Sequence, residues 1–145
     1  MFTVSFSVES SADGLQKFDL DRISECLDET DASSYSDYDS CAHKALEKCQ
    51  KIEKYRLDQC LYIANDSWVF LIESALNDVC KTNPRLCKKA KNISISYRKS
   101  MDNLCDLFVD RDSIGYMQRV EYYSCSLDHL IFHALYARNL TTNYR

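Results

Sequence analysis

The amino-acid sequence predicts an all-α protein, namely a disulfide-stapled bundle of four to five helices. Only two of the 145 residues are glycine and one is proline, so the turn formers that β-hairpins and glycine-rich phosphate loops require are almost absent. Apolar residues recur at helical spacing along most of the chain. Eight cysteines, an even number, are spread over it, and this pattern predicts disulfides that join the helices. The length suits one domain.

The two ends of the chain are expected to lie outside the folded domain. Residues 1–12 begin with a short apolar run that has no basic start. We interpret them as a signal-peptide remnant or a disordered N-terminus rather than as an ordered strand. The helical, cysteine-rich domain is expected to occupy residues 13–138, and residues 139–145 are expected to form a C-terminal tail.

Two helical segments are predicted in the first half of the chain. The first spans about residues 13–29, and the acidic, serine-rich link over residues 30–39 is expected to be a loop. The second helix begins near Tyr38, and its pattern can be extended as far as Asn65–Asp66. The apolar stripe at its start consists of Cys41, Ala45, Cys49 and Ile52.

The third predicted helix has the clearest amphipathic pattern in the chain. Asp66 or Ser67 is a suitable N-cap, because its side-chain oxygen can accept a hydrogen bond from the free N–H groups of the first turn. The apolar residues that follow at helical spacing are Trp68, Leu71, Ile72, Ala75, Leu76, Val79 and Cys80. Asn83–Pro84 predicts the next boundary, since Asn caps helices and Pro is favoured at the first helical position.

A fourth and a fifth helix are predicted in the second half. The fourth has an apolar rhythm from Cys87 to Phe108, and its small residues Ala90 and Ser94 indicate a close approach to a neighbouring helix. Residues 110–113 predict a break, and the fifth helix is expected from about Met117 to Ala134. Because the links are short, consecutive helices are expected to pack antiparallel.

The cysteines are expected to form the framework of the bundle. No CxxC pair occurs, which argues against zinc ribbons and thioredoxin-like redox chemistry. Cys41 and Cys49 lie about 12 Å apart along one predicted helix, too far to bond each other. The bridges are therefore expected to run between helices and to close large loops, while the sequence leaves their pairing open. The eight cysteines are Cys26, Cys41, Cys49, Cys60, Cys80, Cys87, Cys105 and Cys125.

The cysteine spacing resembles that of a nematode secreted domain family of unknown function. The resemblance covers about Cys26 to Cys125, and the segments that carry it are the run from Cys41 to Cys49, the following Cys60, and the helix that ends Asn77-Asp-Val-Cys80. Cys105 and the segment Glu121–Cys125 resemble the C-terminal cysteines of that family. The resemblance implies a helical, cysteine-rich extracellular domain, and it implies no catalytic residue. Members of that family often have more cysteines than this chain.

Secretion is the compartment that the sequence favours. Eight scattered cysteines find partners in an oxidising compartment, whereas a reducing cytosol would leave them as thiols. Three N-x-S/T triplets predict glycosylation at Asn65, Asn92 and Asn139. No stretch reaches the roughly 18 apolar residues of a membrane span. We therefore expect a soluble extracellular glycoprotein without a transmembrane segment.

Charge is distributed unevenly along the chain. Residues 1–40 contain ten acidic and two basic residues, whereas residues 79–101 contain seven basic residues and no acidic one. The basic residues are Lys81, Arg85, Lys88, Lys89, Lys91, Arg98 and Lys99. They predict either a surface for an anionic glycan, a lipid head group or an acidic protein, or a helix that neutralises the acidic N-terminal helix inside the bundle, which we favour. Nucleic acid is not expected as a partner of an acidic secreted protein.

No pattern in the sequence predicts catalysis. The one set that resembles a metal site is Cys125, His129 and His133, at helical spacing, but Leu130 stands where a helical zinc protease motif has its glutamate. We expect two partly buried histidines beside a disulfide instead, and a metal-dependent enzyme that uses His129 and His133 is the most distant hypothesis. We therefore expect a non-enzymatic protein with no cofactor and no metal.

The favoured function is binding of an extracellular or cell-surface protein by a secreted signal, effector or toxin-like factor. Ten tyrosines are consistent with an interface, since tyrosine offers a large contact area at low entropic cost. The alternative is a carrier that holds a small apolar ligand in a cavity between helices, which requires an observed cavity. The residues expected to line that cavity are Phe70, Leu71, Met101, Leu104, Phe108, Met117 and Ile131.

Overall fold

The computed structural model confirms the all-α prediction. It describes residues 3–52, 54–107, 109 and 115–143, and the surroundings of individual side chains from Gln16 to Thr142 within these ranges. This part of the chain contains five α-helices and no strand. The helices are α1 (Thr3–Glu29), α2 (Tyr35–Lys51), α3 (Leu57–Thr82), α4 (Pro84–Asp106) and α5 (Tyr116–Asn143).

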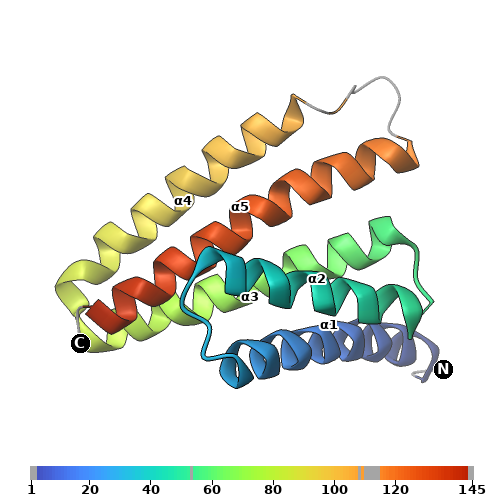
Figure 1. Ribbon diagram of the computed structural model, residues 1–145, viewed down its shortest axis with the longest axis horizontal. Helices are drawn as coiled ribbons and strands as arrows, with labels where there is room; N and C mark the ends of the chain where they lie inside the picture. The colour runs from blue at the N-terminus through green and yellow to red at the C-terminus, as the bar shows by residue number, and fades with distance from the viewer. Residues whose placement is uncertain (1–2, 53, 108, 110–114, 144–145) are drawn as a thin grey trace.

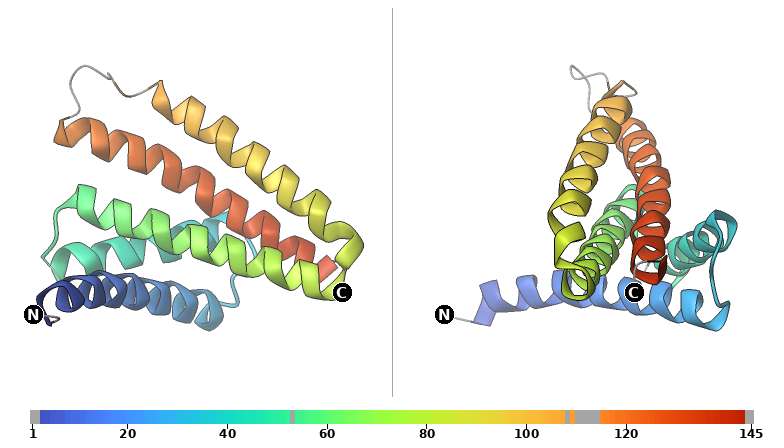
Figure 2. Two further views of the ribbon diagram at one scale, coloured as in Figure 1. Left: turned by 180° about the vertical axis from the view of Figure 1, so that it is seen from behind. Right: turned by 90° about the vertical axis from the view of Figure 1, so that its left-hand side faces the viewer.

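The five helices alternate in direction and form an elongated bundle with α3 at its centre (Figure 1). Among the described residues, α3 packs against each of the other four helices, and α5 packs against α2, α3 and α4. Within the described ranges, helix α1 contacts α2 and α3 but neither α4 nor α5. It crosses beneath α3 on the side of the bundle opposite to α4 (Figure 2). The amphipathic helices therefore pack as a bundle in which short links join consecutive helices, as expected.

The core forms where α3 meets α1, α2 and α5. The largest side chains that are almost completely buried are Trp68 and Tyr38, whose rings lie 6.0 Å apart. The Tyr38 hydroxyl accepts a hydrogen bond of 3.0 Å from Arg138 of α5, so this buried polar group is satisfied. Ile23, Ile72, Val79 and Ile131 complete the apolar centre.

Helix α2 begins earlier than the sequence suggested. The Ser34 side chain accepts a hydrogen bond from the backbone N–H of Asp37, and the Asp37 carboxylate accepts one from the N–H of Ser34. This capping box starts the helix at Tyr35. The prediction that residues 30–39 form a loop is therefore wrong in its second half, because a residue pair expected in a turn caps the helix instead.

The break between α2 and α3 is the largest difference from the predicted elements. It lies between Lys51 and Leu57, where Lys54 has a φ of 57°, and not at Asn65–Asp66. Asn65 is buried, and its Nδ2 donates to the carbonyl oxygens of Leu61 (2.8 Å) and Tyr123 (3.1 Å). A residue type that often ends helices is used here to join α3 to α5, so the helix continues through it.

The start of α4 agrees with the sequence, whereas the two ends of the chain differ from the prediction. Asn83 accepts from the N–H of Leu86, and Pro84 is the first residue of α4, as predicted. Helix α5 continues to Asn143, so residues 139–143 belong to this helix rather than to a separate C-terminal tail. Helix α1 begins at Thr3 rather than near residue 13, so residues 3–12 are helical, and their interpretation as a signal-peptide remnant stays a prediction. The predicted break at 110–113 lies outside the described residues.

All eight cysteines are paired, and each bridge joins two consecutive helices. The pairs are Cys26–Cys41, Cys49–Cys60, Cys80–Cys87 and Cys105–Cys125. The prediction of bridges between helices is confirmed. The prediction of large loops is wrong, because the paired cysteines are only 15, 11, 7 and 20 residues apart. Each bridge therefore fixes one helix–helix turn and leaves the long-range arrangement to the core.

Loop length predicts which bridge contributes least to stability. Cys80 and Cys87 enclose the shortest loop, at a turn that Asn83 and Pro84 already favour. Replacing both cysteines with alanine is expected to lower the free energy of unfolding by about 2.4 kcal/mol, from the entropy of closing such a loop. Urea denaturation of this variant and of the matched Cys26→Ala, Cys41→Ala variant tests the ranking. A smaller loss for the Cys26–Cys41 pair would contradict it.

Candidate functional site

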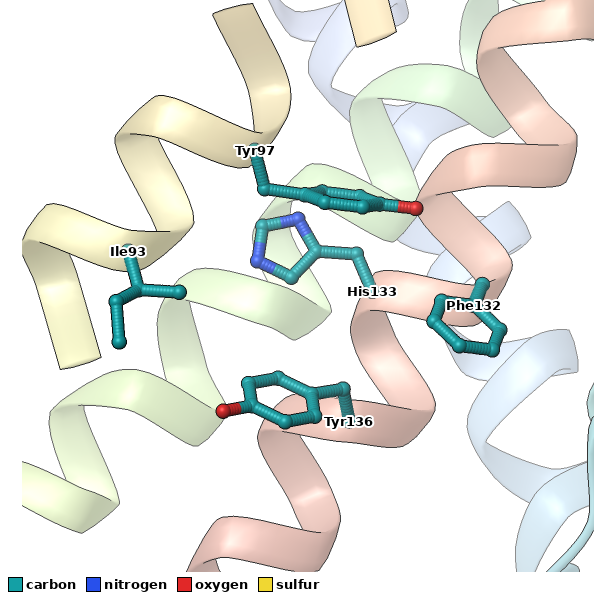
Figure 3. A pocket seen from close by; sticks show the side chains of 5 residues that line it. All are labelled: Ile93, Tyr97, Phe132, His133 and Tyr136. Carbon is teal, nitrogen blue, oxygen red and sulfur yellow. The ribbon is translucent and has the colours of Figure 1, made fainter. Parts of the chain in front are cut away.

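An apolar pocket lies between α4 and α5. It has a cavity volume of about 180 Å³ and is lined by Ile93 and Tyr97 from α4 and by Phe132, His133 and Tyr136 from α5 (Figure 3). Almost all of its lining surface is apolar. Clefts of this kind, with one or two polar groups, are the usual form of a binding site in a helix bundle.

Helical spacing and two small residues explain the position of the pocket. Ile93 and Tyr97 are four residues apart on α4, and Phe132 and Tyr136 are four residues apart on α5, so each pair projects from one face of its helix. Ser94 lies buried between the two helices, where its hydroxyl is close to His133 of α5, and Ala90 one turn before it is also buried. The contact at Ser94 agrees with the close approach predicted for the small residues of α4. The larger side chains next to them are therefore displaced to the rim of the α4–α5 contact.

His133 forms the floor of the pocket. Its side chain is 3% exposed, its Nε2 lies 2.9 Å from the Ser94 hydroxyl oxygen, and its ring meets the Tyr97 ring edge to face at 5.0 Å. Nδ1 has no hydrogen-bond partner among the described residues, and it points toward the Tyr97 ring (Figure 3). A tautomer that accepts from Ser94 at Nε2 and directs its Nδ1–H at the aromatic ring fits both contacts.

The imidazole of His133 is electrically neutral at neutral pH. Burial, assisted by the positive charge of Arg98, lowers the pKa of His133 from its ordinary value of 6.5 to about 4. Proton uptake would place a charge against an apolar wall, which is costly. The pocket is therefore an uncharged, apolar recess under physiological conditions.

Large apolar side chains around the pocket remain exposed. Ile93 is 45% exposed, Phe132 53% and Tyr136 45%. Tyr35 of α2 extends the cluster, because its ring lies 6.4 Å from that of Phe132. We call Tyr35, Ile93, Tyr97, Phe132 and Tyr136 the aromatic patch. The sequence did not predict it, since it depends on the relative positions of three helices.

The predicted histidine and cysteine set is not assembled as a metal site. Cys105, Cys125 and His129 have ligand atoms within 4.8 Å of one another, but both sulfurs belong to the Cys105–Cys125 disulfide and are not thiolates. His133 is engaged with Ser94 instead. The arrangement agrees with the expectation of buried or half-buried histidines beside a disulfide.

The three predicted glycosylation sites differ in exposure. The Asn65 side-chain nitrogen, to which a glycan would attach, is buried and makes two hydrogen bonds. The folded protein has no room for a glycan there, so Asn65 is withdrawn as a candidate. Asn92 and Asn139 are exposed on α4 and α5, and glycosylation at these two residues stays a prediction.

The basic residues of the α4 region do not neutralise the N-terminal helix. Helices α1 and α4 make no contact in the described part of the chain, so the interpretation that we favoured is wrong. Six of the seven basic side chains are exposed and Arg98 is half-buried. None of the seven pairs with a carboxylate among the described residues. The basic surface faces solvent.

Those residues proposed for a ligand carrier that the structure describes do not line a common cavity. Phe70, Leu104 and Met117 are 52%, 44% and 62% exposed, whereas Ile131 is fully buried. Leu71 lines an open hollow near Trp68, and Met101 lines a very small gap beside His129. Phe108 lies outside the described residues. The expected lining is therefore scattered over several faces of the bundle.

A second group of tyrosines surrounds an ion pair at the other end of α5. Asp58 is buried and lies 3.2 Å from Arg119 and 3.3 Å from Arg56. Beside it the rings of Tyr62 and Tyr123 meet edge to face at 5.7 Å, along an open hollow of about 340 Å³. Because its charges are already paired, this region has a clear structural role in fixing α3 against α5.

Among the helices that the structure describes, none combines the length and the apolar character that a membrane span requires.

Comparison of the chain with protein-family models, with curated proteins and with solved structures finds no match. The resemblance to a nematode secreted family therefore stays a prediction.

Proposed function

We propose that this chain is a secreted binding protein that holds a protein partner at the aromatic patch, with one apolar side chain of the partner in the pocket. The observation that supports it is the exposure of Ile93, Phe132 and Tyr136 around a preformed apolar recess. Contiguous exposed apolar surface of this kind is typical of interaction sites. The proposed function involves no chemical step.

The size of the pocket favours a protein partner over a carried ligand. Sites for small molecules usually have volumes of roughly 300–1,000 Å³ and enclose most of the ligand, whereas this pocket measures about 180 Å³ and is open to solvent. A recess of this size suits one anchoring side chain, which is how interface hot spots are commonly built. The larger hollow of about 510 Å³ near Trp68 has charged residues such as Asp28 and Arg138 in its lining, which does not suit an apolar ligand.

The four disulfides support the proposal of an extracellular location. Bridges of this number persist in oxidising compartments and are rare in the cytosol. They also hold consecutive helices together, and the Cys105–Cys125 bridge joins the two helices that form the pocket. Binding to a preorganised surface avoids part of the entropic cost of association.

The experiment selects peptides from a displayed library against the immobilised protein and measures their affinity for two matched variants. Phe132 and Phe70 are equally exposed, at 53% and 52%, but only Phe132 lies on the patch. Phe132→Ala is expected to weaken the selected peptides about 30-fold, the effect of a hot-spot residue, and Phe70→Ala is expected to have no effect. Far-UV circular dichroism confirms that both variants are folded.

Two results would refute this function. One is an equal loss of affinity in the Phe70 and Phe132 variants, and the other is a selection that yields no peptide sensitive to Phe132. Selected sequences are also expected to share one large apolar residue. If they share only acidic residues, the site of interaction lies elsewhere.

A further inference from the structure

The outward face of α4 differs from the face that forms the pocket. Arg85, Lys88 and Lys99 lie at intervals that place them on one side of the helix, with Asn92 between them. All four are exposed. Arg85 and Lys99 are about 21 Å apart along the helix axis at the rise of an α-helix. The basic residues therefore form an extended row rather than a compact cluster.

The basic residues of this row form no ion pair within the described part of the chain. Residues 79–101 contain no acidic residue, and none of their basic side chains pairs with a described carboxylate. Helix α1, which contains much of the acidic charge, lies across the bundle and does not touch α4 in the described part of the chain. The protein as a whole has a net charge of −4. An unpaired positive row on an acidic protein attracts polyanions to one place on its surface.

We propose that the outward face of α4 binds a sulfated polysaccharide. An extended row of fixed positive charges matches a linear polymer with regularly spaced sulfates, and Arg and Lys both form charge-assisted hydrogen bonds to such oxyanions. A helix that docks on an anionic membrane needs a continuous apolar face to insert. On the outward side of α4, the described stretch between Lys88 and Lys99 has one large apolar side chain, that of Ile95. This face is therefore suited to a soluble polyanion.

Asn92 places a modification site within the binding surface. It lies one turn after Lys88 and two turns before Lys99 and is exposed, so a glycan on its nitrogen would cover the row. Its sequon partner Ser94 is buried against His133, and for this reason Asn92→Gln, not a change of Ser94, is the substitution that removes the glycan without disturbing the pocket.

The test measures binding of unglycosylated protein to immobilised heparin oligosaccharides at several salt concentrations. Lys88→Glu with Lys99→Glu is expected to bind at least about tenfold more weakly, and its salt dependence is expected to be less steep by about two counterions. The control is Lys44→Glu with Lys48→Glu, which makes the same charge change at exposed positions of α2. It is expected to bind as the parent does. Desulfated heparin is expected not to bind.

Three results would overturn the proposal. These are an equal loss of affinity in the α2 control, undiminished binding by protein that has a glycan at Asn92, and a preference for phosphatidylserine vesicles over heparin that depends on Ile95. The test is independent of the proposed protein partner, because Phe132→Ala is expected to leave heparin binding unchanged. Failure of one proposal is thereby distinguished from failure of the other.

Discussion

Replacement of Trp68 by alanine is expected to lower the free energy of unfolding by about 4 kcal/mol. Trp68 has no exposed surface and lies on α3, the helix that contacts all four others. Its ring packs against Tyr38 of α2. Alanine would leave a cavity at the centre of the bundle, where several helices would have to move to close it.

A matched variant separates the contribution of the ring from that of its polar atom. The indole nitrogen of Trp68 has no hydrogen-bond partner among the described residues, and a buried unpaired donor destabilises the folded state. Trp68→Phe keeps an aromatic ring and removes that donor, so its loss is expected to be less than half that of Trp68→Ala. Urea denaturation at neutral pH with intact disulfides gives both values. A loss below about 1.5 kcal/mol for alanine would show that the site is not closely packed.

The same tryptophan illustrates what the sequence predicts well. The stripe from Trp68 to Val79 was identified as a core face because its spacing has the helical period, and Trp68, Ile72, Leu76 and Val79 are all buried. The start of α4 at Asn83–Pro84 was equally clear, since both residues have specific roles at helix starts. Local features with one physical explanation are predictable from local sequence.

The break between α2 and α3 shows where the prediction of helix boundaries from local sequence fails. It contains no glycine or proline, and Lys54 adopts a positive φ that non-glycine residues seldom take. The Cys49–Cys60 bridge spans this turn and joins its two ends. Asn65, by contrast, is of a residue type that often ends helices. Its side chain instead donates a hydrogen bond to the backbone carbonyl of Tyr123, 58 residues away, and the helix continues. Both outcomes depend on tertiary contacts that spacing within one segment does not contain.

The candidate site could be predicted only in part from the sequence, for the same reason. Ser94 correctly indicated a contact with a neighbouring helix, but the identity of the partner helix was not encoded locally. The register of α4 against α5 decides that Tyr97 meets His133 and that Phe132 stays exposed. The seven basic residues were found from sequence alone, whereas their isolation from the acidic α1 required the topology.

The free energy of unfolding is expected to fall by about 2.6 kcal/mol as the pH is lowered from 6.5 to 4, from His133 alone. The pKa of this imidazole is about 4 in the folded protein because of burial and the charge of Arg98, whereas in the unfolded chain it has its ordinary value near 6.5. Between these two values the unfolded chain binds a proton that the folded protein does not. Stability from this residue is therefore fully present above pH 6.5 and is lost as the pH falls.

A variant that cannot titrate isolates this effect from the carboxyl groups. His133→Gln can still accept a hydrogen bond from Ser94, and it is expected to lose less stability than the parent over the same pH range. Urea denaturation at pH 7, 6, 5 and 4 measures both slopes, and NMR titration of the imidazole gives the pKa directly. Identical slopes, or titration of His133 near 6.5, would mean that the imidazole is accessible to water. The pocket floor would then be hydrated and polar, and an apolar side chain of a partner would gain little by entering it.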